Sequence, residues 1–184
     1  MLSYRLEDRV TMLGIACGFA PMDRPCASEG MIARMAKAVP SLRRAPWIAR
    51  LATMSLPRQY QRDPAKAFDN QFGRDLPECD RRALSDNDTR QALLDAAVEA
   101  TTRGARQLAT EMQLTFSRPW GFAPSSIKTP TRLWYGAADT LTPLPMGRYL
   151  ARQIPDAELI VYPDEGHMAL INHWSDIIRI LTQS

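Results

Sequence analysis

The sequence predicts an α/β fold in which three parallel strands with flanking helices are interrupted by an all-helical insert. Two short strand-like runs, 131–135 and 159–162, each precede a helical pattern near the C-terminus. A longer apolar run lies near the N-terminus, and residues 26–118 carry no strand-like pattern. Alternating strands and helices indicate a parallel sheet, whereas helical periodicity alone indicates a separate helical layer.

The composition is that of an ordinary globular protein. The 184 residues are 45% hydrophobic and 23% charged, and this length corresponds to about one domain. The apolar content excludes a disordered chain. No run approaches the roughly 20 apolar residues that a membrane-spanning helix needs.

Residues 1–25 contain the first predicted strand. The run Val10–Phe19 is mostly apolar, follows a charged turn and ends shortly before Pro21. Apolar runs of this length with β-branched and aromatic residues are typical of parallel strands buried on both faces. We therefore expect a buried strand here.

Residues 26–118 form the predicted helical domain. Apolar residues recur at helical spacing in three groups: Met31, Ile32, Met35, Ala36 and Val39; Trp47, Ile48, Leu51 and Met54; and Leu93, Leu94, Ala97 and Val98. Prolines at positions 40, 46, 57, 64 and 77 are expected to cut its first part into short helices.

Residues 119–184 return to alternating strands and helices. The predicted elements are the strand Thr131–Tyr135, the helix Met146–Gln153, the strand Leu159–Tyr162 and the helix Asn172–Leu181. Together with Val10–Phe19 they give three parallel strands. In such sheets, ligands and reacting groups gather beyond the carboxyl ends of the strands.

An aspartate and a histidine follow the last two predicted strands. Asp139 comes after Thr131–Tyr135, and His167 follows Gly166 after the next strand. Taken singly, the aspartate fits a turn residue and the histidine an ordinary loop residue. At neighbouring strand ends they fit the orienting half of a catalytic triad, in which a carboxylate holds an imidazole that accepts a proton.

The residues around this pair resemble the C-terminal part of an α/β-hydrolase fold enzyme. The resemblance is carried by the segments 127–130, 134–139, Pro143, 154–157 and 165–167. It implies that residues 1–25 hold strand 6, residues 26–118 a helical cap, and residues 119–184 strands 7 and 8. It also places Asp139 and His167 on the positions of the catalytic acid and base.

The sequence departs from this family at the nucleophile. The family carries it on a G-x-S-x-G turn before strand 6, and these 184 residues contain no such motif. Residues 1–6 resemble the tail of the helix that follows that turn. We therefore expect a partial fold without the nucleophile and oxyanion hole, inactive as this chain alone.

The resemblance implies a hydrolase of ester, amide or related bonds in small-molecule substrates, with no metal or organic cofactor. The alternative is a non-catalytic interaction fragment that pairs with a separate chain. Without the neighbouring strand of the intact family, Val10–Phe19 would present an unpaired apolar edge, so self-association is also expected.

The charge distribution leaves a further alternative. The formal net charge is only +3, but eight basic residues lie between positions 29 and 66 against Glu29 and Asp63. Such a stretch can bind polyanions or an anionic membrane surface. The solvated face of helices is the better explanation of this stretch, so we expect neither nucleic acid nor membrane as a partner.

The cysteines indicate a reducing compartment. Cys17, Cys26 and Cys79 are odd in number and contain no C-x-x-C pair, so their spacing predicts neither a disulfide framework nor a zinc site. A cytoplasmic location follows as an expectation. We expect Cys17 to be a buried structural thiol without a strained turn around it, and His173 to lie on a helix surface.

Overall fold

The structure is a computed structural model that describes residues 9–73 and 75–183. The helix tail expected at residues 1–6 lies outside these ranges. The chain divides into two compact units, unit 1 (Met1–Met31 and Pro119–Ser184) and unit 2 (Ile32–Arg118). Residues 26–31, which the sequence assigned to the helical insert, lie in unit 1, where the 3₁₀ turn η2 (Pro25–Ala27) packs against helix α9 (Leu144–Gln153).

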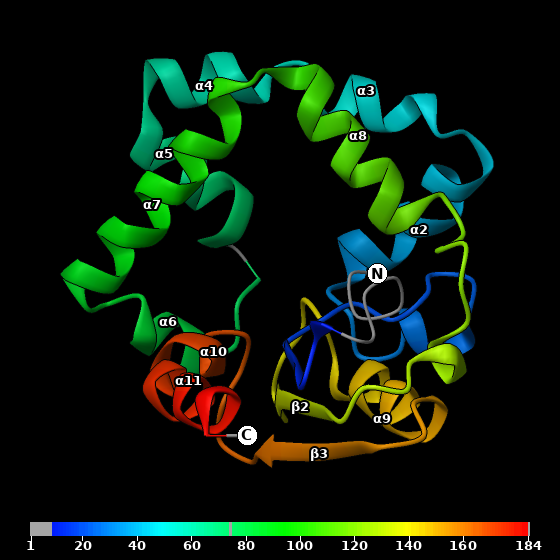
Figure 1. Cartoon of the computed structure of the whole chain (residues 1–184). Helices are drawn as coiled ribbons and strands as arrows, with labels where there is room; N and C mark the ends of the chain where they lie inside the picture. The colour runs from blue at the N-terminus through cyan, green and yellow to red at the C-terminus, as the bar shows by residue number, and fades with distance from the viewer. Residues whose placement is uncertain (1–8, 74, 184) are drawn as a thin grey trace. The chain divides into compact units, whose positions relative to one another are not determined.

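Unit 1 is built on a parallel sheet, which confirms the predicted fold class. Its strands are β1 (Leu13–Ala16), β2 (Thr131–Gly136) and β3 (Ala157–Tyr162), in the order β1-β2-β3. Both pairings are parallel, so all three carboxyl ends lie at the same edge. Figure 1 shows β2 and β3 beside α9.

Helices cover both faces of the sheet. Trp134 and Tyr135 are consecutive in β2, so their side chains point to opposite faces. A Cβ added at Gly14 would meet Trp134 and Leu181 of α11 (Trp174–Thr182), while one at Gly147 of α9 would meet Tyr135. Helix α11 therefore covers one face and α9 the other, with β2 buried between them.

The first strand differs from its prediction. The sequence predicted a strand over Val10–Phe19 buried on both faces, but β1 spans only Leu13–Ala16 and is half-buried, with Gly14 exposed. Among the residues in the structure, β1 pairs with β2 alone, so it is an edge strand and lacks the cover of a central one. The strand ends before Cys17, whose φ of +48° turns the backbone.

The closing helix is also interrupted. The sequence predicted one helix over Asn172–Leu181, but the structure has α10 (Ala169–Asn172) and α11, which meet at His173. The imidazole of His173 stacks on the ring of Tyr162, with centroids 3.7 Å apart and planes within 3°. This contact with the end of β3 accompanies the break.

The regular elements of unit 2 are all helical within its described residues. Its elements are α2 (Ala33–Arg44), α3 (Trp47–Thr53), α4 (Leu56–Arg62), α5 (Pro64–Phe68), a π-helical turn (Asp69–Gly73), α6 (Glu78–Ala83), α7 (Asn87–Thr102) and α8 (Ala105–Phe116). The prolines at 46, 57, 64 and 77 lie at the starts of helices, where a missing N–H costs little. Pro40 was expected to cut a helix but lies inside α2.

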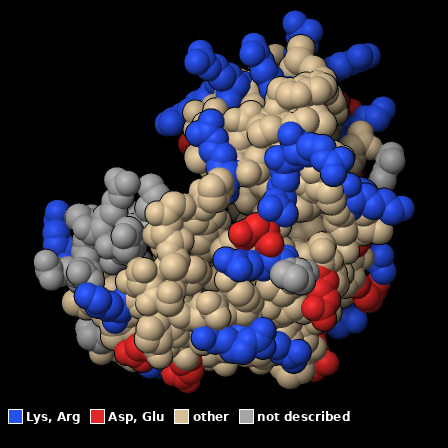
Figure 2. Space-filling model, turned by 90° about the vertical axis from the view of Figure 1, so that its right-hand side faces the viewer, with Lys and Arg blue, Asp and Glu red and all other residues tan. Residues whose placement is uncertain are grey.

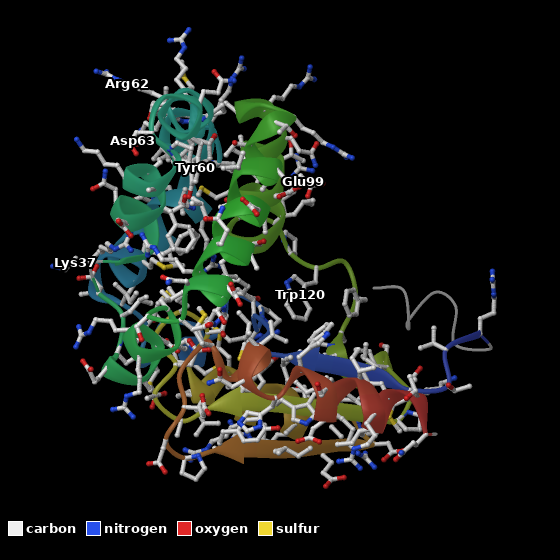
Figure 3. The ribbon with its side chains drawn as sticks, turned by 90° about the vertical axis from the view of Figure 1, so that its left-hand side faces the viewer. Lys37, Tyr60, Arg62, Asp63, Glu99 and Trp120 are labelled. Atoms are coloured by element: carbon white, nitrogen blue, oxygen red, sulfur yellow. The ribbon has the colours of Figure 1, made fainter. Side chains whose placement is uncertain are left out.

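Buried polar contacts join the helices of unit 2. The Thr53 hydroxyl of α3 donates to the carbonyl of Ala49 at 2.9 Å and is 3.1 Å from that of Ala105 at the start of α8. The Tyr60 hydroxyl donates to Gln71 Oε1 at 2.7 Å, and Figure 3 shows Tyr60 among the side chains of this unit. No helix in the described ranges combines the length and apolar character that a bilayer crossing needs.

A glycine at the end of β2 allows the strand-end loops of unit 1 to approach each other. A Cβ on Gly136 would lie 2.2 Å from the carbonyl oxygen of Gly166 and 2.4 Å from that of Glu165. Both are backbone atoms, so the loop before His167 would have to move.

We expect Gly136→Ala to destabilise unit 1 by about 3 kcal/mol or more, because overpacking against backbone cannot be relieved by a side-chain rotation. The measurement is chemical denaturation followed by circular dichroism. Gly73→Ala is the matched control, since its nearest contact would be an ordinary 3.7 Å. Equal stability of the two variants would contradict the prediction.

Candidate active site

Asp139 lies in the turn that follows β2, and its carboxylate is buried. Oδ1 accepts hydrogen bonds from the backbone N–H groups of Leu141 at 2.7 Å and Thr142 at 2.9 Å. Oδ2 accepts the hydroxyl of Thr142 at 2.7 Å. The turn thus supplies three donors to one buried carboxylate, which fixes its orientation and offsets its desolvation.

His167 lies in the loop after β3 and completes this set of donors. Its Nδ1 is 2.8 Å from Asp139 Oδ2, and the imidazole side chain is 27% exposed. The two loops are joined by backbone bonds from Ala138 N–H to Glu165 O and from Ala137 N–H to Tyr162 O, both 2.9 Å. The structure therefore brings together the two residues that the sequence singled out.

The hydrogen-bond pattern assigns the proton on the imidazole. A carboxylate accepts but does not donate, so the 2.8 Å contact requires a proton on Nδ1 of His167. Nε2 is then the nitrogen that can accept a proton in the neutral ring. The Thr142 hydroxyl, 3.2 Å from Nδ1, is committed to Asp139 Oδ2 at the shorter distance.

Cys17 is a third member of this strand-end cluster, and sequence analysis missed its place there. Its buried thiol donates to the backbone carbonyl of His167 at 3.6 Å. The ligand atoms of Cys17, Asp139 and His167 all lie within 4.8 Å of one another. Burial, reinforced by the negative charge of Asp139, raises the pKa of the Cys17 thiol to about 12.

The backbone at Cys17 also corrects the expectation of an unstrained turn. With φ at +48°, Cys17 has the left-handed conformation that non-glycine residues rarely adopt. Its N–H continues the sheet pairing to the carbonyl of Trp134 at 2.8 Å. The signal for Cys17 in the sequence is its position near the end of the first predicted strand, the counterpart of the positions of Asp139 and His167.

Two aromatic side chains lie near the cluster. The Tyr135 hydroxyl donates to the carbonyl of Gly18 at 2.6 Å, joining the ends of β1 and β2, and burial raises the pKa of this phenol. His173, which stacks on Tyr162, has Nε2 3.3 Å from Glu165 Oε1. His173 thus contacts the loop that carries His167 and is only partly exposed.

Unit 2 carries a hollow and a group of basic side chains. A shallow hollow of about 340 Å³ is lined by residues of α4, α5 and the π-helical turn: Gln59, Arg62, Asp63, Lys66, Ala67 and Asn70. Figure 3 shows Arg62 and Asp63 at the end of α4. Figure 2 shows Lys and Arg side chains gathered at the top of the view, over unit 2. None of these features contains a residue of the strand-end cluster.

Thr142 and Thr140 provide a matched pair for testing the buried carboxylate. We expect Thr142→Val to destabilise the protein by about 2 kcal/mol, because a fully buried hydrogen bond to a charged group is lost. Thr140 is the control, since its buried hydroxyl has no hydrogen-bond partner within the described part of the chain. Thr140→Val should leave the free energy of unfolding unchanged or slightly raise it, as measured by urea denaturation.

Thr142→Ser adds a second check, because it restores the hydroxyl without the methyl group. We expect it to recover most of the loss. Equal destabilisation by Thr142→Val and Thr140→Val would show that the hydroxyl of Thr142 does not stabilise the carboxylate.

The curated proteins that match this sequence carry the same name. No protein-family model matches the sequence. A curated pimeloyl-[acyl-carrier protein] methyl ester esterase of Chromobacterium violaceum is 40% identical over 57 residues, which cover 31% of this chain and 22% of that protein. The protein of the same name from Aromatoleum aromaticum is 30% identical over 94 residues, which cover 48% of this chain and 38% of that protein.

Solved structures agree with the sequence matches. A thermophilic esterase from Thermogutta terrifontis matches 98% of this chain with a TM-score of 0.60 and 20% identity. An α/β hydrolase from a deep-sea metagenome library matches 97% with a TM-score of 0.51 and 16% identity. The chain spans 60% and 57% of these two structures and less than two fifths of the curated relatives. Its fold is that of part of an α/β hydrolase.

Proposed function

We propose that this chain supplies the acid and the base of an ester hydrolase, with Asp139 as the acid and His167 as the base. The observation that carries the proposal is the 2.8 Å contact between Asp139 Oδ2 and His167 Nδ1. It joins a buried carboxylate to a partly exposed imidazole at the carboxyl ends of adjacent parallel strands. A catalytic base needs this combination of a fixed tautomer and access to the reacting atoms.

The proposed mechanism is acyl transfer through a covalent intermediate. His167 Nε2 takes the proton from a nucleophile, which attacks the ester carbonyl, and returns that proton to the leaving alcohol. The same nitrogen then takes a proton from water, which attacks the acyl intermediate, and returns that proton to the nucleophile as the acid is released. Asp139 stabilises the imidazolium formed in each half of the reaction by remaining ionised.

The nucleophile of this mechanism is not among the strand-end residues. Cys17 is unsuited to the role, because the pKa of its thiol is raised to about 12 and its Sγ donates to the backbone of His167. The sequence contains no G-x-S-x-G turn. The proposal therefore requires a nucleophile and oxyanion donors from outside these 184 residues, on the same polypeptide or on an associated chain.

The names of the two curated relatives suggest the substrate class. Both are methyl ester esterases that act on a pimeloyl group of an acyl-carrier protein. We propose a carboxylic ester of an acyl chain as the substrate, with unit 2 as the cap that limits its size. The proton transfers use side chains alone, so the mechanism calls for no metal or organic cofactor.

The hydrolase proposal is tested by joining this chain to the N-terminal part of a related esterase. We expect the chain alone to leave p-nitrophenyl acetate and short acyl methyl esters unhydrolysed. Fused behind the N-terminal part of the Aromatoleum aromaticum esterase, in place of that protein's own C-terminal part, it should hydrolyse both. His167→Ala and Asp139→Asn should then reduce kcat by at least about 10²- to 10⁴-fold.

The matched control for this assay is His173→Ala, since His173 contacts Glu165 rather than Asp139. We expect this variant to keep activity within tenfold of the unaltered fusion. Full activity in the His167→Ala fusion would contradict the assignment of the base. Hydrolysis by the 184-residue chain, abolished by His167→Ala, would contradict the need for an external nucleophile.

A second candidate function rests on the edge of the sheet. Within the described ranges β1 pairs only with β2, so its other edge carries backbone groups without a strand partner. An edge of this kind is a template for pairing with another chain. The chain would then act as an interaction module whose partner adds a strand next to β1.

Size-exclusion chromatography with light scattering tests this candidate. We expect the chain to elute as a dimer or larger species, and Ile15→Lys, which places a charge on β1, to shift it toward the monomer. A folded monomer at all concentrations up to 100 μM would remove the support for strand pairing without affecting the hydrolase proposal.

A further inference from the structure

Three different metal-ligating groups meet at the carboxyl ends of the three strands. Cys17 offers a sulfur, Asp139 an oxygen and His167 a nitrogen, and these atoms lie within 4.8 Å of one another. No other group of three such side chains is close enough to hold an ion in the part of the chain that the structure describes. All three belong to unit 1, so the cluster is formed within one compact unit.

The size of the cluster suits a small divalent ion. The ligand atoms lie no more than 4.8 Å apart, and the separation between Asp139 Oδ2 and His167 Nδ1 is 2.8 Å. Bonds from Zn²⁺ to sulfur, nitrogen and oxygen are about 2.0–2.3 Å long. Tetrahedral ligand atoms at these bond lengths are roughly 3.3–3.6 Å apart. The Asp139 oxygen and His167 Nδ1 would therefore separate by about 0.5 Å, and Cys17 Sγ would move inward by about 1 Å.

The charges of the cluster also match a divalent ion. The Asp139 carboxylate and a Cys17 thiolate would together cancel both charges of Zn²⁺ in a site where net charge is costly. In the metal-free protein the Cys17 thiol donates to the carbonyl of His167, so it carries its proton. Binding would release that one proton to solvent and replace it with the metal–sulfur bond.

We propose that Cys17 Sγ, the Asp139 carboxylate and His167 Nδ1 form a binding site for Zn²⁺ or a similar thiophilic divalent ion. The mixture of thiolate, imidazole and carboxylate favours zinc or cadmium over magnesium or calcium, which select oxygen ligands. The Thr142 hydroxyl lies within 3.2 Å of both Asp139 Oδ2 and His167 Nδ1. It would serve as a fourth ligand or hold a water molecule that does so.

Metal binding here would be inhibitory, a consequence that rests on the proposed function. With the ion on Nδ1, the neutral imidazole carries its proton on Nε2. That nitrogen can no longer accept a proton from a nucleophile, and Asp139 no longer orients the ring. Occupation of the site would therefore switch off the base without any change in the fold.

The test measures metal binding directly and not through activity. The background protein is the 184-residue chain with Cys26→Ser and Cys79→Ser, which leaves Cys17 as the only thiol. Isothermal titration calorimetry with Zn²⁺ gives Kd and stoichiometry, and titration with Cd²⁺ reports thiolate binding through its ultraviolet charge-transfer absorbance. We expect one ion per chain and a charge-transfer band.

Variants of the ligands identify the site. Cys17→Ser should remove the absorbance band and weaken Zn²⁺ binding. The loss should exceed the roughly 10- to 100-fold that follows removal of a residue that only hydrogen-bonds to a metal ligand. Cys17→Gly is the second variant, because glycine accepts the φ of +48° without strain. His173→Gln is the matched control, since His173 and Glu165 form the other imidazole–carboxylate pair, at 3.3 Å.

The outcomes separate the two proposals. Unchanged Zn²⁺ affinity in both Cys17 variants, or its loss in His173→Gln alone, would overturn the metal site. Binding that depends on Cys17 and His167 would support it even if the fused protein hydrolysed no ester. Conversely, an active fusion that neither binds nor responds to Zn²⁺ would refute the metal site and leave the hydrolase proposal intact.

Discussion

The buried carboxylate of Asp139 is the group on which the arrangement of this site depends. Four donors surround it: two backbone N–H groups, the Thr142 hydroxyl and the imidazole of His167. An ionised group without these partners would be costly to bury, so the turn and the histidine loop are both required for its place in the structure. The parallel sheet supplies the geometry, because it brings the ends of β2 and β3 to the same edge.

A glycine at this edge allows the loops after β2 and β3 to contact each other. Gly136 lets the backbone of Glu165 and Gly166 approach the end of β2 more closely than any side chain would permit. The loop after β3 then bonds to Ala138 through its backbone and to His173 through Glu165. His167 is thus placed mainly by backbone contacts, which leaves its side chain partly exposed while its partner is buried.

The sequence predicted the parallel strands and the Asp139–His167 pair because local patterns determine both. Short apolar runs ending in Gly136 or followed by Gly166 mark strand ends, and strand ends in a parallel sheet converge. The left-handed backbone of Cys17 and the helix break at His173 could not be predicted in this way. The first is accompanied by pairing with Trp134 and the second by stacking on Tyr162, and both partners are distant in sequence.

The exposure of β1 shows the same dependence on distant partners. An apolar run predicts burial, yet burial of a strand requires neighbours on both sides, and in the described residues β1 has one. Cys17 at its end is nevertheless buried, since β2 and the His167 loop cover it. The strand-end cluster is therefore enclosed by the elements after residue 130, whereas the other edge of β1 has no strand partner within the described residues. This division explains how Asp139 and His167 are held together although β1 lies at the edge of the sheet.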